Sequence, residues 1–513
     1  MNESANVERQ RAGYAGMAGV AVALGFTELF AGMFASVPSA MASIGAVVVD
    51  LSPPWLQKFA IRIFGTQDKL VLGIGIFVVA ALIGMVLGGR SAKSPTPIIV
   101  GFAAFGVVGI AVQLQEPEAV PGAVVAATLI AMGIGIAAFY WLKMVWVPTE
   151  RDFADETTND IGRRRMLLGV AAVATVTVVT IGAGRLMLRS RSEAQRAALV
   201  LPIPLQALPD PGPEHDFGLE GVAPVVVSNA TFYRIDTALV VPAIDPEMWS
   251  LRIHGMVDEE ITLTYADIEG MNQIERYVTL SCVSNEVGGR LVGNALWTGV
   301  LLKDVLELAG IRPGAEQLVS RSVDGWSSGF PVEYALGDAE AMIATGMNRE
   351  VLPTSHGFPA RLVVPGLYGY VSATKWLKEI ELATWDGFDG YWIPRGWDKE
   401  GPILTQARID RPNREGSITA GSFTLGGVAW APTRLIDRVE VQIDDGPWVE
   451  AELAESLSDA SWRLWKIDAE FEPGDHTASV RATDGTGATQ TDVRKRSRPG
   501  GATGYHKIAF TAT

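Results

Sequence analysis

The only cysteine of this chain, Cys282, stands out among 513 residues as a side chain suited to chemistry. The run Tyr277–Leu280 just before it predicts a buried strand that carries Cys282 at its end. Polar and glycine residues follow over 284–289 and indicate a loop that a ligand can approach closely. A thiol at a strand end is either a reactive or metal-binding group or simple core filling, because free cysteines are often buried. Composition alone leaves both interpretations open.

Composition narrows the chemistry that the rest of the chain can support. The net charge of −15 argues against a nucleic-acid partner, because nucleic-acid binding needs a basic face. A single cysteine excludes a disulfide within the chain, a four-cysteine iron–sulfur cluster and a C-x-x-C-H haem attachment. The first histidine is His215, so the apolar N-terminal part cannot supply a histidine ligand to haem. We therefore expect no haem or iron–sulfur cluster in this chain.

Five apolar runs precede residue 190, each near the roughly 20 residues that cross a bilayer as a helix. They are Ala12–Ser36, Leu70–Gly89, Ile98–Leu114, Ala119–Leu142 and Met166–Gly184. Lys and Arg gather before the first run, between the second and third, and before the fifth, whereas 114–121 has neither. The positive-inside rule then places the N-terminus in the cytoplasm, and five spans leave everything after Gly184 outside the cytoplasmic membrane. The segment Val37–Lys69 is interpreted as a loop or an interfacial helix.

Charged residues at two places in this membrane part carry further hypotheses. Arg163, Arg164 and Arg165 before the fifth run resemble a twin-arginine export signal, here internal. The simpler interpretation is a positive-inside anchor. An export signal would let the following domain cross the membrane already folded, as a protein needs if its cofactor is inserted in the cytoplasm. Glu28 lies inside the first run, where a carboxylate is costly unless it is paired or hydrated.

The rest of the chain divides into three regions of different composition. Residues 191–228 are rich in Pro, Gly, Ala and charge, which predicts a linker with no core. Residues 229–400 mix strand and helix patterns and predict an α+β domain. Residues 401–513 show short alternating strands, several separated by Asp-Gly turns, and predict an all-β sandwich. The expected fold is multi-domain, beginning with an α-helical membrane bundle of about five spans over 1–190.

The run from about Thr231 to the C-terminus resembles the sulfite oxidase family of molybdopterin oxidoreductases. The residues that carry the resemblance are FYRIDT, RYVTLSC with NALWTG after it, SVDG, HGFPARLVVPGLYGY, TKWL, and GVAWAP with RATDGTG near the end. The resemblance covers a little over half of the chain and leaves the membrane part outside. It implies a sulfite-oxidase-type molybdopterin domain, followed by an Ig-like domain of the kind through which family members dimerise, in a membrane-anchored bacterial branch.

The same resemblance implies a site built around a molybdenum–molybdopterin cofactor. Cys282 matches the family's single cysteine, whose thiolate is the protein's ligand to molybdenum, and a soft thiolate suits a metal already held by dithiolene sulfurs. The pterin is anionic and rich in hydrogen-bonding atoms, so its site needs cations, small residues and polar anchors. The positions that match the family's cofactor-binding residues are Tyr233, Arg234, Asp324, His356, Arg361, Thr374 and Lys375.

The substrate side departs from the sulfite-oxidising branch. In that branch an arginine four residues after the cysteine helps to bind the anionic substrate, whereas this chain has Glu286 there. A carboxylate would repel sulfite by about 1 kcal/mol or more, so the substrate is left open, with sulfite as one candidate. Tyr391 lies near the position of the family's substrate-side tyrosine and joins Cys282 and Glu286 in the predicted catalytic set.

The predicted function is oxygen-atom transfer to or from a small molecule by a membrane-anchored, extracytoplasmic molybdopterin enzyme. Electrons must pass through a separate partner, because the chain shows no haem or cluster ligands. The other expected partners are the lipid bilayer and a second copy of the chain. Two other classes are weighed beside this one: a cysteine-nucleophile enzyme with His356 as the base, and a non-enzymatic, membrane-tethered scaffold built on the C-terminal domain.

Overall fold

The computed structural model describes residues 2–53, 56, 59–60, 63–64, 67–116, 119–146, 158–238 and 240–513. Contacts within the chain define two compact units. The helical unit comprises Met1–Ala194 with Ala238–Ala243, and the β-rich unit comprises Gln195–Thr237 with Ile244–Thr513. All strands of the described residues belong to the β-rich unit.

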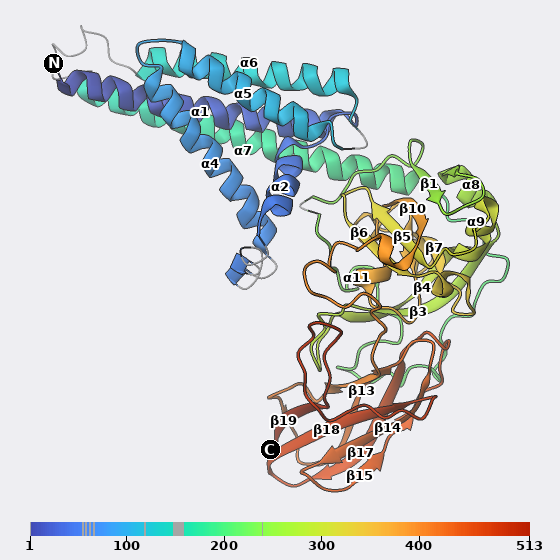
Figure 1. The fold of residues 1–513 in the computed structure, drawn as a ribbon. Helices are drawn as coiled ribbons and strands as arrows, with labels where there is room; N and C mark the ends of the chain where they lie inside the picture. Colours follow the sequence, from blue (N-terminus) through green and yellow to red (C-terminus); the bar gives the residue numbers. More distant parts are fainter. Residues whose placement is uncertain are drawn as a thin grey trace. The chain divides into compact units, whose positions relative to one another are not determined.

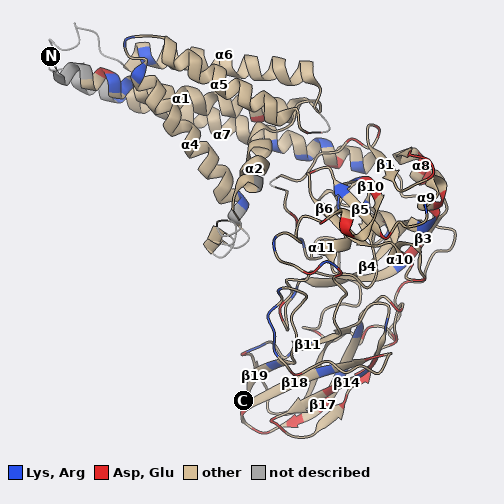
Figure 2. Cartoon of the chain, in the orientation of Figure 1, with Lys and Arg blue, Asp and Glu red and all other residues tan. Residues whose placement is uncertain are grey.

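Long apolar helices make up the helical unit. In the described residues they are α1 (Asn2–Met33), α2 (Ala40–Leu51), α4 (Asp68–Arg90), α5 (Thr96–Gln113), α6 (Pro121–Trp146) and α7 (Thr158–Ala198). Five helices are long and apolar enough to cross a membrane, at Asn6–Met33, Lys69–Arg90, Thr96–Gln113, Pro121–Trp146 and Arg164–Ala198. Figure 2 shows the long uncharged stretches along α4, α5 and α6. The five apolar helices are thus confirmed, while the sidedness of the chain stays a prediction.

Small residues allow close packing of α1 in this unit. Helix α1 packs against both α4 and α6 (Figure 1). A Cβ on Gly16 of α1 would overlap the carbonyl of Gly84 on α4, and one on Gly88 would overlap the carbonyl of Ala12. Such small-residue contacts are how helices associate inside a bilayer, where the hydrophobic effect does not drive them together.

Glu28 on α1 is buried, and two of its partners come from the segment Val37–Lys69, which the sequence predicts as a loop or an interfacial helix. The Glu28 carboxylate accepts hydrogen bonds from Ser39 Oγ at 2.7 and 2.9 Å and from Met41 N at 3.2 Å. Both donors lie at the N-terminus of α2, where the helix dipole favours an anion. Arg185 Nη2 on α7 lies 3.6 Å from Glu28 Oε2. The carboxylate is therefore paired within the helical unit.

The first half of the β-rich unit contains two sheets. One sheet has the order β2-β1-β10-β5-β6 and is antiparallel except for the parallel β1–β10 pair. The other has the order β3-β4-β7-β8, with β9 also paired to β7. The strands are β1 (Ser250–Gly255), β2 (Ile261–Thr264), β3 (Gln273–Ser281), β4 (Val292–Leu301), β5 (Gln317–Ser322), β6 (Ser327–Pro331), β7 (Met342–Met347), β8 (Glu350–Val351), β9 (Arg361–Val363) and β10 (Leu377–Ala383).

Short helices connect these strands. They are α8 (Tyr265–Gly270), α9 (Leu302–Ala309), α10 (Glu333–Leu336) and α11 (Gly369–Ser372). Trp297 on β4 and Val278 and Leu280 on β3 are buried in the cluster beneath the second sheet. The mixture of strands and helices predicted for this region is confirmed, and strand β3 ends one residue before Cys282, as predicted.

Two further sheets form the C-terminal part, with orders β11-β13-β17-β16 and β12-β19-β18-β14-β15. Their strands are β11 (Gln406–Arg411), β12 (Ser417–Ile418), β13 (Gly421–Trp430), β14 (Ile436–Ile443), β15 (Trp448–Glu450), β16 (Glu452–Leu453), β17 (Arg463–Phe471), β18 (Gly474–Asp484) and β19 (His506–Ala512). Residues of both sheets share one buried core, including Leu425, Trp465, Val480 and Phe510. The all-β content is confirmed, whereas the Ig-like topology stays a prediction.

The region predicted as a linker differs from the expectation in two ways. Helix α7 continues to Ala198, beyond the predicted end of the span at Gly184. The extended residues that follow are bound to the second sheet: Tyr277 Oη donates to the carbonyl of Pro209 at 3.0 Å, and Asn294 Nδ2 donates to that of Val225 at 2.9 Å. A linker without packing contacts is therefore corrected to a segment that side chains of β3 and β4 hold in place.

The export hypothesis falls partly outside the described residues. The side chain of Arg163 and residues 147–157 lie outside them, as do parts of the segment before α4. Arg164 and Arg165 are exposed on α7.

Candidate active site

Strand β3 delivers Cys282 to the start of a short loop. The strand pairs with β4 along its whole length, and the backbone N–H of Cys282 donates to the carbonyl of Leu291 at 2.9 Å. The thiol is half-buried, and its Sγ lies 2.9 Å from Ser284 Oγ. Burial raises the pKa of the Cys282 thiol, and the hydrogen bond to Ser284 opposes that effect. The thiol is thus fixed at a strand end and faces polar neighbours.

Two tyrosines lie close enough to Cys282 to interact with its charge. Burial raises the pKa of Tyr233, and a negative charge on Cys282 raises it further. Burial also raises the pKa of Tyr368 to about 12, with Cys282 acting in the same direction. The Tyr233 ring stacks on Phe232 with ring centroids 5.2 Å apart, and Tyr368 Oη accepts a hydrogen bond from Leu404 N at 3.4 Å. Both phenols are therefore neutral groups beside the thiol.

Arg361 on β9 is a buried cation whose hydrogen-bond partners in the described residues are backbone carbonyls. It is 5% exposed, and its guanidinium donates to the carbonyls of Leu362 at 3.3 Å and His356 at 3.0 Å. The guanidinium carbon lies 4.9 Å from the centroid of the Trp297 ring. Burial lowers the pKa of Arg361 to about 10, and Tyr233 is the group that opposes this. Within the part of the chain that the structure describes, no Asp or Glu pairs with Arg361 within 4.0 Å. Its charge is left for an anion from outside the chain.

A second group of charges surrounds Asp236. The Asp236 carboxylate lies 2.8 Å from Lys375 Nζ and 2.8 Å from Arg234 Nε. Burial lowers the pKa of Lys375 to about 8, and Asp236 counters that fall. Burial raises the pKa of Asp324; the charge of Asp236 raises it further, and that of Lys375 lowers it. Asp324 Oδ2 accepts a hydrogen bond from Thr237 Oγ1 at 3.5 Å. The structure thus brings Arg234, Asp324 and Lys375 together and adds Asp236 as the group that links them.

His356 is held in its neutral form at the end of a short 3-10 helix, Thr354–His356. Its Nε2 lies 2.9 Å from the carbonyl of Asn229, so Nε2 carries the proton and Nδ1 is left as an acceptor. Burial lowers the pKa of His356 to about 4, which keeps the ring uncharged at neutral pH. Its own carbonyl accepts from Arg361, so His356 lies directly beside that cation.

The remaining predicted residues have other surroundings. The Thr374 hydroxyl is fully buried between Ser320 Oγ at 2.6 Å and Ser328 Oγ at 3.0 Å. Glu286 is exposed and accepts a hydrogen bond from Ser497 Oγ at 3.0 Å. The Tyr391 ring packs edge-on against Trp392 and lies 3.6 Å from the guanidinium carbon of Arg395. These contacts of Tyr391 lie after β10 and involve none of the groups around Cys282.

Sequence reasoning missed Ser284, Asp236 and Tyr368. Asp236 and Tyr368 lie inside the segments FYRIDT and VVPGLYGY that carried the resemblance. Asp236 follows Arg234 by two residues, and a carboxylate so close to a required cation is a signal for an ion pair. Nothing in the sequence indicated that Tyr368 approaches Cys282, because that contact depends on how β3 and the segment after β9 pack together.

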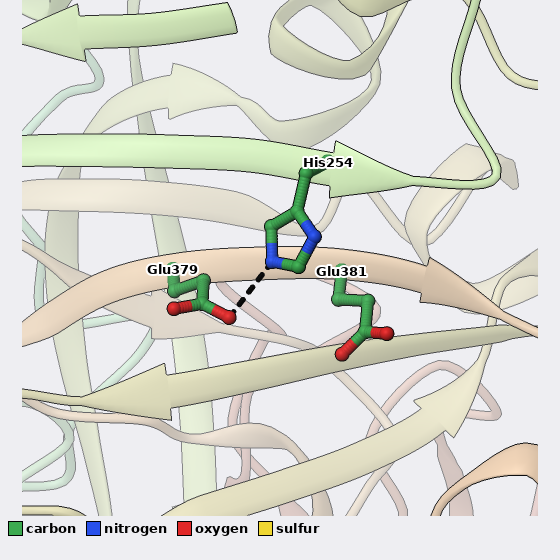
Figure 3. Close-up of side chains that lie close together, drawn as sticks. All are labelled: His254, Glu379 and Glu381. Atoms are coloured by element: carbon green, nitrogen blue, oxygen red, sulfur yellow. Dashed lines mark hydrogen bonds and ion pairs between the residues drawn. The ribbon is translucent and has the colours of Figure 1, made fainter. Parts of the chain in front are cut away.

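A third group of titratable side chains lies on the first sheet (Figure 3). His254 on β1 and Glu379 and Glu381 on β10 present ligand atoms within 4.8 Å of one another. His254 Nε2 lies 2.7 Å from Glu379 Oε1, and Arg321 on β5 pairs with both carboxylates. One guanidinium thus bridges both carboxylates and offsets one of their two negative charges, and the group is a half-exposed ion-pair network across three strands.

The chain is similar to several known proteins. Residues 238–392 match the family described as the oxidoreductase molybdopterin binding domain. An uncharacterized oxidoreductase of Bacillus subtilis, YuiH, is 31% identical over 157 residues, which is 31% of this chain and 76% of the relative. Mouse mitochondrial sulfite oxidase is 29% identical over 281 residues, 45% of this chain and 51% of the relative. The sulfane dehydrogenase SoxCD structure from Paracoccus pantotrophus aligns at 21% identity and TM-score 0.49, covering 60% of this chain and 87% of that one.

The family match over residues 238–392 defines the class of the chain as a molybdopterin-binding oxidoreductase. More narrowly, the chain belongs to the sulfite oxidase family. It spans about half the length of the mouse and rat sulfite oxidases that it matches.

Proposed function

We propose that this chain is a membrane-anchored molybdenum enzyme that transfers an oxygen atom to or from a small molecule. The observation that carries the proposal is Arg361, a buried cation with no carboxylate partner among the described residues, beside Tyr233, whose phenol also lies within reach of the charge of Cys282. An unpaired buried charge is costly to a folded protein unless a ligand compensates it. An anionic pterin and a sulfur-bound metal are the ligands that a cation and a thiol together would suit, so the residues present fit the family's cofactor.

The roles of the surrounding residues follow from their geometry. Cys282 would supply the protein's thiolate to molybdenum, which when bound supplies two-electron oxygen-atom transfer. Arg361 and Lys375 would neutralise the anionic groups of the pterin, and Arg234, which is 44% exposed, would close over it from the solvent side. Asp324 and the free Nδ1 of His356 would accept hydrogen bonds from the pterin ring.

Tyr233 and Thr374 would act differently from these polar anchors. Tyr233 would present a neutral phenol on the metal side, because burial and Cys282 both raise its pKa. Thr374 would contribute through its backbone, because its hydroxyl is already bound to Ser320 and Ser328. That buried hydroxyl network would fix the position from which Lys375 extends.

The proposal for the substrate rests on Glu286. Glu286 is exposed on the loop after Cys282, and its negative charge there would repel an approaching anion such as sulfite. We propose a small substrate whose reacting oxygen or sulfur carries less charge than sulfite, with sulfite as the reference compound. Relatives named sulfite oxidase support the reaction class rather than the substrate. Tyr391 would act only if its segment approached the metal side in the loaded enzyme.

The cellular setting is proposed from the helices. Five apolar helices support anchoring in the cytoplasmic membrane, with residues 191–228 linking the anchor to a molybdopterin domain over 229–400. The charge pattern supports a catalytic region on the extracytoplasmic side, which the arginines at 163–165 would direct to export. A separate carrier would take or supply electrons, and an Ig-like domain over 401–513 would pair two copies.

The cysteine-nucleophile alternative gains no support from the geometry. His356 donates Nε2–H to the carbonyl of Asn229, and its pKa is held near 4, so it would be a weak base. The thiol's described partner is Ser284 rather than His356.

Metal and pterin analysis of the purified full chain tests the proposal. After expression in a host that makes the cofactor, we expect about one molybdenum and one pterin per chain, and oxidant and reductant screens should include sulfite, sulfoxides and N-oxides. X-ray absorption of the Cys282→Ser variant should show one sulfur ligand fewer at molybdenum, whereas Ser284→Ala should keep it. A wild-type chain without molybdenum, or an unchanged number of sulfur ligands in Cys282→Ser, would contradict the assignment of Cys282 as a molybdenum ligand.

Replacement of Arg163, Arg164 and Arg165 by Lys tests export. If this variant still delivers a cofactor-loaded domain to the exterior, the twin-arginine route is excluded.

A further inference from the structure

Three consecutive cations, Arg494, Lys495 and Arg496, form an exposed segment between β18 and β19, here called the basic loop. It is a local excess of positive charge in a chain whose net charge is −15. Among the described residues, none of the three pairs with an acidic side chain within 4.0 Å, and Asp492 nearby leaves the loop net positive. Salt bridges elsewhere on this surface, such as Arg252–Glu260, show the usual pairing that the basic loop lacks.

The backbone of the basic loop is fixed rather than loose. Lys495 and Thr503 exchange two backbone hydrogen bonds, at 3.1 and 3.2 Å, and Gly501 N donates to the carbonyl of Ser497 at 2.6 Å. Thr503 Oγ1 also donates to the carbonyl of Val493 at 2.6 Å. The backbone that carries the three cations is therefore anchored to the segment before β19, so the cations project from a defined part of the surface.

Two residues beyond the basic loop, Ser497 and His506, contact the loop that follows Cys282. The buried Ser497, next to Arg496, donates its hydroxyl to Glu286 at 3.0 Å. His506 lies against Gly288, where a Cβ would overlap the His506 ring. Burial lowers the pKa of His506 to about 4, and the charges of Arg408 and Arg494 act in the same direction. Four residues span at most about 14 Å, so Glu286 lies within about that distance of Cys282, and Ser497 joins the end of the basic loop to Glu286.

We propose that the basic loop is the docking surface for an acidic electron-carrier protein that exchanges electrons with the cofactor at Cys282. The inference rests on the proposed function. At each encounter the carrier would gain one electron as the reduced cofactor loses one, so two carriers restore the oxidised enzyme. A protein partner is favoured over a small anion because the cations face solvent, while the Glu286 carboxylate lies between them and Cys282. Proximity to Cys282 favours a redox partner over a lipid surface.

Reoxidation kinetics test this docking surface without knowledge of the substrate. Holoenzyme is reduced with dithionite, freed of the excess, and mixed in a stopped-flow instrument with a c-type cytochrome of strong negative net charge. The loop variant carries Arg494→Gln, Lys495→Gln and Arg496→Gln. The control carries Arg252→Gln, Arg312→Gln and Arg438→Gln, which removes the same charge from exposed positions on other parts of the surface. A neutral, water-soluble quinone serves as the small acceptor.

At low salt we expect the second-order rate constant with the acidic cytochrome to fall about tenfold in the loop variant, the size typical of lost electrostatic steering. The control variant should stay within about twofold, the quinone rate should not change, and high salt should remove the difference. Equal losses in both variants would overturn the proposal, because net charge rather than the loop would then decide the rate. An equal loss with the quinone would also overturn it, and so would a variant whose only defect is weaker binding to vesicles containing phosphatidylglycerol.

Molybdenum analysis of the same preparations separates this inference from the proposed function. If the wild-type chain contains no molybdenum, both the proposed function and the docking surface are wrong. If the wild type contains molybdenum and the loop variant reacts normally with the acidic cytochrome, only the docking surface is wrong.

Discussion

Replacement of Arg361 by Met should separate cofactor retention from protein stability. A fall of its pKa from 12.5 to about 10 corresponds to a burial penalty of about 3 kcal/mol. Met removes that penalty but leaves the carbonyls of Leu362, His356 and Ala373 without their donor, at a cost of about 1 kcal/mol each. The two effects nearly cancel, so the cofactor-free variant should differ from the wild type by no more than about 1 kcal/mol.

The cofactor-bound state should respond far more strongly to the same change. A unit negative charge about 4 Å from the guanidinium contributes about 4 kcal/mol at an effective dielectric constant of 20. That energy corresponds to a roughly thousandfold loss of affinity, so Arg361→Met should retain little molybdenum. The assay combines molybdenum and pterin per chain with thermal unfolding of the cofactor-free protein.

Arg321→Met is the control for this experiment. Arg321 is also a partly buried guanidinium, but its charge is already matched by Glu379 and Glu381. We expect it to keep normal molybdenum content. Full occupancy in Arg361→Met, or an equal loss in Arg321→Met, would refute the argument that an unpaired buried cation holds the cofactor.

Two further predictions concern stability. Burial alone would raise the pKa of Asp484, but hydrogen bonds from Thr486, Thr405 and Arg434 lower it to about 2. Because the folded-state pKa is depressed, the ionised carboxylate contributes about 2 kcal/mol of stability above pH 4, and this contribution is lost as the pH falls toward 2. The unfolding temperature of Asp484→Asn should therefore depend less steeply on acid pH than that of the wild type. An unchanged slope would contradict this. Trp462 is buried and donates its Nε1–H to the carbonyl of Val225 at 2.8 Å. Trp462→Ala should lower the free energy of unfolding of the β-rich unit by about 3–5 kcal/mol in denaturant titrations, whereas Trp462→Phe should cost clearly less.

The apolar helices and the placement of Cys282 could be predicted because each depends on a local pattern. About 20 uncharged residues have few alternatives to a spanning helix, and a short apolar run before a glycine-rich loop favours a strand. The extension of α7 to Ala198 was missed because the arginines after Gly184 suggested a boundary. Those residues are nevertheless good helix formers, since Arg, Leu, Met, Gln and Ala lose little freedom in a helix.

The partners within the site could not be predicted in the same way. Thr374 precedes Lys375 in the chain, yet its hydroxyl points into a buried network with Ser320 and Ser328. Asp236 acquires its role only when β-rich segments distant in sequence bring Lys375 beside it. Such pairings depend on which strands become neighbours, and a single sequence carries no direct record of that.

Strand β3 has a consequence for how the enzyme can be divided. The carbonyl of Tyr277 accepts from Ser458 Oγ at 2.6 Å, and Thr279 Oγ1 accepts from Trp462 N at 2.8 Å. The strand that ends at Cys282 is therefore bonded to the segment between β16 and β17 of the C-terminal part. A fragment confined to 238–392, the residues that match the family, would lack these bonds together with Tyr233, Arg234 and Asp236. The piece that keeps these bonds is larger than the domain by which the chain is classified.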